Sequence, residues 1–212
     1  MATQSACYPI VPWFSRLPGG LDFGGRRYPL DPTLPACDRD HALHGHGWVS
    51  PWEVTKQSTD RLACQFDYAP GPRRFPFPFR AAQIFSIDED AFHIELSVQN
   101  TGDAAMPAGL GLHPFFPRDA DTQLSFSGRA AALTDKAMDD SFPDWGGRAQ
   151  IAQPDGGLEV VSNAAILHLY APNNEQFFCA EPVSHLPGEV GKTTLAPGEL
   201  LKIFWKIAPI SA

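Results

Sequence analysis

The chain has 212 residues, enough for one large domain with a sizeable buried core or for two small ones. Its formal net charge of -8 argues against nucleic acid or an anionic membrane as the main partner, so a small neutral ligand is the simpler expectation. With 21 prolines and 18 glycines, the composition predicts short elements separated by frequent turns and argues against long helices.

Cysteine usage and the amino terminus bear on the cellular compartment. The four cysteines are scattered without the CxxC spacing of zinc or thioredoxin-like sites, so we expect free thiols in a reducing cytoplasm. Residues 1–6 have neither the basic nor the apolar region of a signal peptide, and no window reaches about 18 apolar residues. We therefore expect a soluble cytoplasmic protein with no membrane partner.

The first strongly patterned stretch is an apolar and aromatic run, residues 7–17, that contains a single cation, Arg16. An arginine here is either a solvated strand end or a forked set of donors for an oxygen-rich ligand. Residues 21–30 then predict a β-hairpin with Gly24 and Gly25 at its tip.

Three histidines follow within six residues: His41, His44 and His46. A cupin-type metal strand would need a glutamate four or five residues after the last of them, where this chain has Ser50 and Pro51. Strand alternation would still put His44 and His46 on one face, which leaves a metal site open. The favoured interpretation is a glycine-spaced loop that aims one or two imidazoles at a ligand.

Trp48 and Trp52 lie just beyond these histidines and would form apolar walls of such a site, so Trp48 is a ligand-binding candidate, although core packing is the commoner fate of a tryptophan. From Trp52 onward the apolar pattern has period two, which predicts antiparallel strands. The clearest spans residues 91–99, and the others span residues 61–69, 80–87, 122–126, 158–161, 165–170, 176–180 and 200–208.

Residues 109–117 hold His113 between two glycines and two prolines. The glycines permit close approach or positive φ, while Pro114 and Pro117 withdraw two ladder donors, so we expect regular structure to break just past His113. A histidine presented at a strand end, with a pKa of roughly 6.5, could exchange a proton near neutral pH. The alternative is an ordinary histidine beside an aromatic cluster.

Two carboxylate-bearing segments complete the candidates. Residues 138–148 predict an aspartate-rich loop, which by composition alone is a capped turn or solvated surface. Glu181 precedes Pro182 at the predicted end of a strand, as in the geometry expected at His113, although a solvent-facing terminus has the same pattern. Ten or more short strands with almost no helical period predict an all-β sandwich or barrel.

Six stretches, in this order, resemble the aldose 1-epimerase (mutarotase) family, and the resemblance covers nearly the whole chain. Each is weak alone, but the six together are specific. They are YPIVPWFSRL (residues 8–17), HALHGHGWVSPWEV (residues 41–54), the run from FPFPF to LHPFFP (residues 75–117), MDDSFPDWGGR (residues 138–148), FFCAEPVSHLPGEV (residues 177–190) and LAPGEL (residues 195–200).

The resemblance implies a galactose-mutarotase-like β-supersandwich of antiparallel sheets with very little helix, formed by residues 1–212 as one domain. It implies a small-molecule sugar substrate and interconversion of the α and β anomers of a free aldose without a cofactor. In that mechanism a glutamate takes the proton of the anomeric hydroxyl while a histidine, on the opposite side of the hemiacetal, protonates the ring oxygen. The ring opens, C1 rotates and the sugar recloses.

The family motifs assign roles to particular residues. Glu181 in CAEP matches the general base and His113 in GLHPFF the general acid, while His44 in LHGHG matches the histidine on the ring-oxygen side of the sugar. Arg16 and Asp139 match the residues that bind sugar hydroxyls. A carboxylate or an imidazole that acts as a general acid or base typically raises the reaction rate by about a hundred- to ten-thousand-fold.

The chain departs from the family pattern in two ways. Ser15 stands where members usually have asparagine, so one sugar contact is expected to be lost or mediated by water. The chain also begins almost at the arginine strand, so we expect it to lack the family's first strands. A sheet edge exposed in this way would favour a homodimer or leave part of the cleft open.

Alternatives stay open beside a mutarotase of free sugars. One is a non-catalytic carbohydrate-binding protein on the same fold, and another is a mutarotase of sugar phosphates. The cations available for a phosphate are Arg16, Arg73, Arg74 and Arg118. A metal-dependent β-barrel enzyme that uses the three clustered histidines is disfavoured by the failed cupin spacing.

Overall fold

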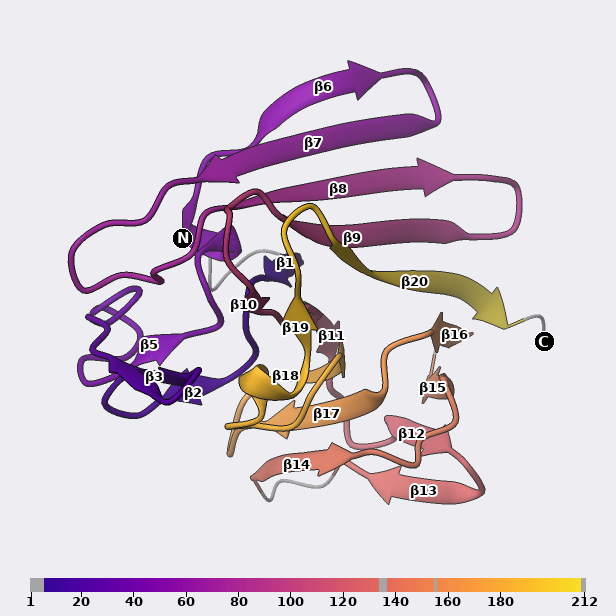
Figure 1. The fold of residues 1–212 in the computed structure, drawn as a ribbon. Coiled ribbons are helices and arrows are strands. Elements are labelled where there is room, and N and C mark those ends of the chain that lie inside the picture. Colours follow the sequence, from indigo (N-terminus) through magenta and orange to yellow (C-terminus); the bar gives the residue numbers. More distant parts are fainter. Residues whose placement is uncertain (1–5, 134–136, 155, 211–212) are drawn as a thin grey trace.

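The computed structural model describes residues 6–133, 137–154 and 156–210, and most of its strands belong to two antiparallel sheets (Figure 1). The larger sheet has nine strands in the order β13-β12-β15-β16-β20-β9-β8-β7-β6. These strands are β6 (Glu53–Gln57), β7 (Arg61–Tyr68), β8 (Phe79–Ile87), β9 (Phe92–Asn100), β12 (Gln123–Phe126), β13 (Arg129–Ala132), β15 (Arg148–Gln153), β16 (Gly156–Ser162) and β20 (Leu200–Ile210).

The smaller sheet has five strands in the order β1-β11-β18-β17-β14. These are β1 (Cys7–Ile10), β11 (Gly111–Pro117), β14 (Met138–Phe142), β17 (Ile166–Ala171) and β18 (Phe177–Val183). Three short ladders pair β2 (Arg16–Leu17) with β5 (Ala42–Leu43), β3 (Leu21–Phe23) with β4 (Arg26–Tyr28), and β10 (Met106–Pro107) with β19 (Thr194–Leu195).

Helix is confined, within the described ranges, to the two 3-10 turns η2 (Gly47–Val49) and η3 (Val190–Lys192). The prediction of an all-β fold of antiparallel sheets is therefore confirmed. No helix in the described part of the chain is long and apolar enough to cross a membrane.

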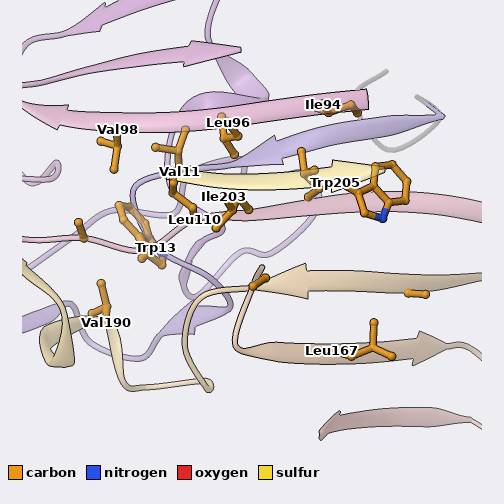
Figure 2. Packing of buried hydrophobic residues seen from close by; sticks show 14 of the residues in the cluster. Val11, Trp13, Ile94, Leu96, Val98, Leu110, Leu167, Val190, Ile203 and Trp205 are labelled. Carbon is orange, nitrogen blue, oxygen red and sulfur yellow. The ribbon is translucent and has the colours of Figure 1, made fainter. Parts of the chain in front are cut away.

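Alternating burial explains why these segments form strands. In β9, Ile94, Leu96 and Val98 point to one face and are buried, while the residues between them are partly exposed. Ile203 and Trp205 of the neighbouring β20 lie in the same buried cluster (Figure 2). In a strand such as β9, the single apolar face fixes the register, because a slip of one residue would turn that face to solvent.

The five-stranded sheet also contributes to this core, but through only one of its faces. Leu112, Leu167 and Phe178 belong to the core cluster that contains β9 and β20. Phe116 of β11 reaches Trp205 of β20, with ring centroids 6.3 Å apart. The residues that alternate with these face the other way, and the polar side chains described below lie on that second face.

Most strand predictions are confirmed, including the hairpin whose tip is Gly24 and Gly25. The predicted break after His113 is wrong, because β11 continues through Pro114 to Pro117. The Phe115 N–H points toward the β1 side, where it donates to the Ala6 carbonyl at 2.9 Å. The backbone donor that Pro114 lacks would face β18. The hydrogen bonds between β11 and β1 are therefore preserved.

Two further boundaries differ from the sequence predictions. Glu181 does not end a strand, because β18 continues through Pro182 to Val183. Residues 138–142 are not a loop but β14, an edge strand paired with β17. Edge positions tolerate the aspartates of this segment, because its outer side is open to solvent.

Candidate active site

The register of the five-stranded sheet lines up one row of side chains across all five strands. Tyr8 pairs with His113, and the register that pairs Gly111 with Val183 and Phe115 with Cys179 puts His113 opposite Glu181. On the other side of β18, His168 pairs with Glu181, and Ser141 pairs with His168. Directly opposed residues project from the same face of a sheet, so the row from Tyr8 to Ser141 shares one face.

A second row lies two residues along each strand and therefore faces the same way. It contains Phe115, Cys179, Tyr170 and Asp139. Together with the segments around β2 and β5, the two rows enclose a cavity of about 290 Å³. Its lining consists of Tyr8, Phe14, Ser15, Arg16, Cys37, Leu43, His44, His113, Phe115, Asp139, His168, Tyr170, Phe177 and Glu181.

His113 and Glu181 form a buried pair in this cavity. The Nε2 atom of His113 lies 3.2 Å from Oε1 of Glu181, and the two side chains are 8% and 1% exposed. Burial, reinforced by the charge of Asp139, raises the pKa of Glu181 well above its usual value. Burial, reinforced by the charge of His168, lowers the pKa of His113 to about 3. Both shifts favour the state in which Glu181 keeps its proton and the imidazole of His113 is neutral.

Aromatic rings hold the imidazole of this pair in place. Tyr8 stacks on His113 with ring centroids 4.4 Å apart, and Phe115 stacks on it with centroids 4.9 Å apart. His113 and Glu181 are side by side on adjacent strands and do not face each other across the cavity. The antiparallel register makes them direct neighbours.

His44 is fixed by the segment that leads into β2. The Ser15 N–H donates to Nδ1 of His44 at 3.2 Å, and the His44 N–H donates to the Ser15 carbonyl at 3.1 Å. Burial, with the charges of His113, His168 and Arg16, lowers the pKa of His44 well below its usual value. Because the imidazole is neutral and its Nδ1 accepts, its proton lies on Nε2, which can donate to a ligand.

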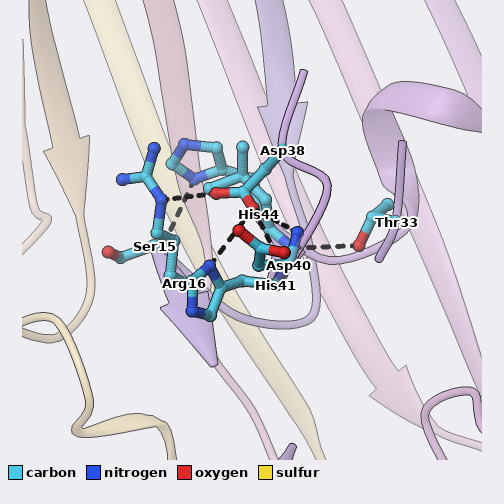
Figure 3. A network of polar contacts seen from close by, with 8 residues as sticks. Ser15, Arg16, Thr33, Asp38, Asp40, His41 and His44 are labelled. Atoms are coloured by element: carbon cyan, nitrogen blue, oxygen red, sulfur yellow. Dashed lines mark hydrogen bonds and ion pairs between the residues drawn. The ribbon is translucent and has the colours of Figure 1, made fainter. Parts of the chain in front are cut away.

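Arg16 reaches the cavity from the exposed end of β2, where Asp38 orients it (Figure 3). Its Nε donates to Asp38 Oδ2 at 2.6 Å, and Asp38 also accepts from the backbone N–H groups of Asp40 and His41. Burial would raise the pKa of Asp38, but these hydrogen bonds outweigh it and hold the pKa well below its usual range. Asp38 is thus a charged anchor for the guanidinium.

Asp139 of β14 is held by a short hydrogen-bond chain that runs from Ser141 on the same strand through His168 of β17. Nε2 of His168 lies 3.2 Å from Oδ1 of Asp139, and Nδ1 of His168 lies 2.8 Å from the Ser141 hydroxyl. Burial lowers the pKa of His168 despite the nearby charges of Asp139 and Asp140. A neutral ring beside a carboxylate that can only accept carries its proton on Nε2, so Ser141 donates to Nδ1.

Trp48 and two of the clustered histidines lie outside the cavity lining. Trp48 stacks behind Tyr8 at 5.4 Å and donates from Nε1 to the Leu43 carbonyl. His46 stacks on Tyr68, with centroids 4.7 Å apart. The Nδ1 atom of His41 lies 3.2 Å from Asp38 Oδ1. The three clustered histidines therefore diverge, and a metal site built from them has no support in this geometry.

The five residues with family roles, Glu181, His113, His44, Arg16 and Asp139, do line one cavity. Tyr8, Asp38 and His168 are not among the site residues predicted from the sequence. His168 had a usable signal, since it alternates with the buried leucines of a predicted strand, but its importance depends on which strands are neighbours. Strand order was not available from alternation alone.

Known proteins share the sequence pattern and the fold of this chain. The aldose 1-epimerase family model matches residues 2–139. The uncharacterized protein YphB of Escherichia coli (strain K12) is 30% identical over 94% of this chain and 82% of its own length.

Solved structures show the same fold. A protein of Escherichia coli K12 proposed to be an aldose 1-epimerase has a TM-score of 0.89 and 26% identity, with 100% of this chain and 86% of that chain covered. Galactose 1-epimerase from Lactobacillus acidophilus NCFM has a TM-score of 0.76 and 17% identity, with 96% and 80% covered. The galactose mutarotase-like fold predicted from the sequence is confirmed, and the chain belongs to the aldose 1-epimerase family.

Proposed function

We propose that the protein is an aldose 1-epimerase that interconverts the α and β anomers of a free sugar by acid–base catalysis at His113 and Glu181. The observation that carries the proposal is the buried pair itself, with Nε2 of His113 and Oε1 of Glu181 3.2 Å apart at the cavity wall. The two oxygens that exchange protons in a hemiacetal are bonded to the same carbon. Two adjacent groups can therefore each reach one of them.

The proton count supports the mechanism. Transfer of the shared proton from Glu181 to His113 gives a carboxylate and an imidazolium without exchange with solvent. Glu181 then accepts the proton of the anomeric hydroxyl as the C1–O5 bond breaks, and His113 protonates the ring oxygen. The pair again holds one proton, now on Glu181, and the reverse transfers close the ring after C1 has rotated. Such acid–base assistance typically contributes about 10²- to 10⁴-fold for each group.

The other groups of the cavity would bind the sugar. His44 offers an Nε2 donor close to His113, with ring centroids 5.4 Å apart. Arg16 would donate to hydroxyl oxygens and Asp139 would accept from hydroxyl groups. Among the cavity-lining residues of the described chain, Arg16 is the one arginine or lysine. Arg73 is paired with Asp31 and Arg74 lies over Tyr68, which favours an unphosphorylated sugar over a sugar phosphate.

The test is anomer exchange on a panel of free aldoses, followed by NMR exchange spectroscopy or polarimetry. Glu181→Gln and His113→Asn are each expected to lower the rate at saturating sugar by at least about a hundredfold. The matched controls are Glu95→Gln and His93→Asn on β9, outside the cavity, which are expected to leave the rate unchanged.

A wild-type chain that binds a sugar but does not exceed the buffer rate with any of them would overturn the proposal. That result would favour the non-catalytic carbohydrate-binding alternative. Full activity in both variants would exclude the His113–Glu181 pair as the catalytic groups even if the wild type is active.

A further inference from the structure

A cysteine lies against the His113–Glu181 pair, and the proposed epimerase mechanism does not use it. Among the residues that the structure describes, one group of His, Cys, Asp and Glu side chains is close enough to hold a metal ion. It consists of His113, Cys179 and Glu181, each offering one ligand atom, with all three atoms within 4.8 Å of one another and all three residues buried.

The sheet explains the convergence. Cys179 and Glu181 are two residues apart on β18, so their side chains share a face, and His113 projects from the same face of β11 directly opposite Glu181. Packed strands fix all three ligands, and no mobile loop is involved. The Oε2 atom of Glu181 and the Nδ1 atom of His113 are buried without a hydrogen-bond partner, so metal binding would not have to break existing bonds at these two atoms.

The donor set suits a thiophilic divalent cation. A thiolate sulfur, an imidazole nitrogen and a carboxylate oxygen are the ligands that Zn²⁺ takes in proteins, and three protein ligands with one open position form an accessible zinc site. Here the open position would face the cavity, because His113 and Glu181 line it. Mg²⁺ and Ca²⁺ prefer oxygen ligands alone, so the cysteine selects against them.

Charge balance also favours a divalent ion. The Cys179 thiolate and the Glu181 carboxylate would each supply one negative charge, and the imidazole of His113 would be neutral. Two anionic ligands and one neutral imidazole would then neutralise the 2+ charge. A neutral complex avoids the large free-energy cost of an uncompensated buried charge.

We propose that His113, Cys179 and Glu181 form a binding site for a thiophilic divalent cation of the Zn²⁺ type, and that the bound cation blocks the cavity's acid–base pair. Binding of the cation stands independently of the proposed epimerase activity. Only the inhibitory consequence rests on the proposed epimerase activity. Inhibition would follow because both proton-transfer groups would be metal ligands and could not exchange protons with a sugar.

The direct test uses Co²⁺ as a spectroscopic probe on the purified chain in the absence of sugar. Co²⁺ is expected to produce the intense near-ultraviolet band of thiolate-to-cobalt charge transfer, and Zn²⁺ is expected to displace it. Cys179→Ala should abolish the band and weaken Zn²⁺ binding in calorimetry by roughly a hundredfold or more, at least as much as loss of an outer hydrogen-bond partner costs.

The matched controls are the other cysteines. Cys37 lines the cavity mouth and is exposed, Cys7 is half-buried and Cys64 is buried elsewhere, so alanine at each should retain the band. A band that survives Cys179→Ala, or that disappears in Cys37→Ala, would overturn the proposal. If Cys179→Ala does not fold, Glu181→Gln provides the second variant, and undiminished Zn²⁺ affinity in it would also refute the site.

The inhibitory consequence is tested separately with wild type and Cys179→Ala in the anomer-exchange assay. Zn²⁺ is expected to suppress the wild-type rate. In Cys179→Ala, the rate with Zn²⁺ is expected to equal the rate of the same variant without Zn²⁺, because the variant lacks the sulfur ligand. A wild type that binds Co²⁺ through Cys179 but has no exchange activity would refute the epimerase and leave the metal site standing. Equal inhibition of both proteins would refute metal control of the pair.

Discussion

His168 is the residue whose neighbours most clearly extend the site beyond the family motifs. It lies directly opposite Glu181, its Nε2 is 3.2 Å from Asp139, and its ring meets Phe14 edge-on with centroids 5.0 Å apart. The side chain is 8% exposed although Asp139 itself is 67% exposed. A buried imidazole thus orients an exposed carboxylate at the cavity edge, and we expect it to act as a positioning residue.

Replacement of His168 by Phe is expected to weaken sugar binding more than turnover. The phenyl ring can keep the contact with Phe14 but cannot donate to Asp139, and a hydrogen bond to a charged group is worth about 1.5–3 kcal/mol. We expect KM to rise about tenfold or more with a smaller change in kcat, measured by anomer exchange. His168→Gln, which keeps a donor, should recover part of the loss. A fall in kcat of about tenfold with KM unchanged would contradict a positioning role.

Short motifs identify candidate residues only where the motif carries its own chemistry. His113 and Glu181 were found from short strings, but their contact was not, because a distance between residues 68 positions apart depends on strand pairing. Asp38 was missed for a related reason. An aspartate in a polar loop resembles a solvated turn until the hydrogen bond to Arg16 is known.

The strand β11 carries His113 and Phe115 of the cavity, and the chain just before it passes very close to His185. A Cβ at Gly109 would lie 2.2 Å from Nε2 of His185, much too close for any side chain. That nitrogen accepts a hydrogen bond from the Phe14 N–H at 3.2 Å, and Phe14 leads through Ser15 to Arg16. The glycine therefore allows His185 to hold the segment that carries Arg16.

Gly109→Ala is expected to destabilise the fold by about 1–3 kcal/mol, because a packed interior accommodates an extra methyl only by shifting its neighbours. The measurement is the free energy of unfolding in urea. Gly191→Ala is the matched control, since a Cβ there meets nothing nearer than 3.9 Å and the position does not require positive φ. Equal stability of the two variants would show that His185 can move away without consequence.

Alternation predicts best the strands that have one apolar and one partly exposed face, such as β9. The predicted ends of β11 and β18 are wrong, because Pro114 and Pro182 predict strand ends where both strands continue. A proline removes one donor, and in an antiparallel strand that donor faces only one of the two neighbours. The cost to the ladder therefore depends on which neighbour is present, and local sequence does not contain that information.

For the molecule as a whole, buried histidines make stability depend on pH. Burial, with a smaller effect of the Arg74 charge, lowers the pKa of His46 to about 4 from an ordinary value of 6.5. Below pH 6.5 the unfolded chain binds a proton that the folded chain does not. The free energy of unfolding therefore falls as the pH is lowered from 6.5 toward 4.

His46→Phe should reduce this acid sensitivity, because phenylalanine can retain the stacking on Tyr68 without a titrating group. The stability lost between pH 7 and pH 4 is expected to be about 3 kcal/mol smaller in the variant than in the wild type. Urea unfolding at both pH values measures the difference. Parallel pH profiles for the two proteins would show that His46 titrates alike in the folded and unfolded states.

The self-association expected from the sequence stays a prediction. The outermost strand β6 of the nine-stranded sheet is exposed along its whole length, but it carries Glu53 and Lys56 and a bulge between Val54 and Lys56. Charges and bulges of this kind discourage edge-to-edge pairing. Sedimentation velocity over a range of concentrations would decide whether the chain is a monomer.

The position of β20 has a consequence for how the protein is made. This strand follows every other described strand in the chain, yet it lies inside the nine-stranded sheet, between β9 and β16. Before β20 has been synthesised, the strands β6 to β9 and the strands β12, β13, β15 and β16 can pair only as two separate half-sheets, each with a bare backbone edge where β20 will pair. Unpaired strand edges favour aggregation, so we expect the chain to be most prone to it in the interval before β20 emerges.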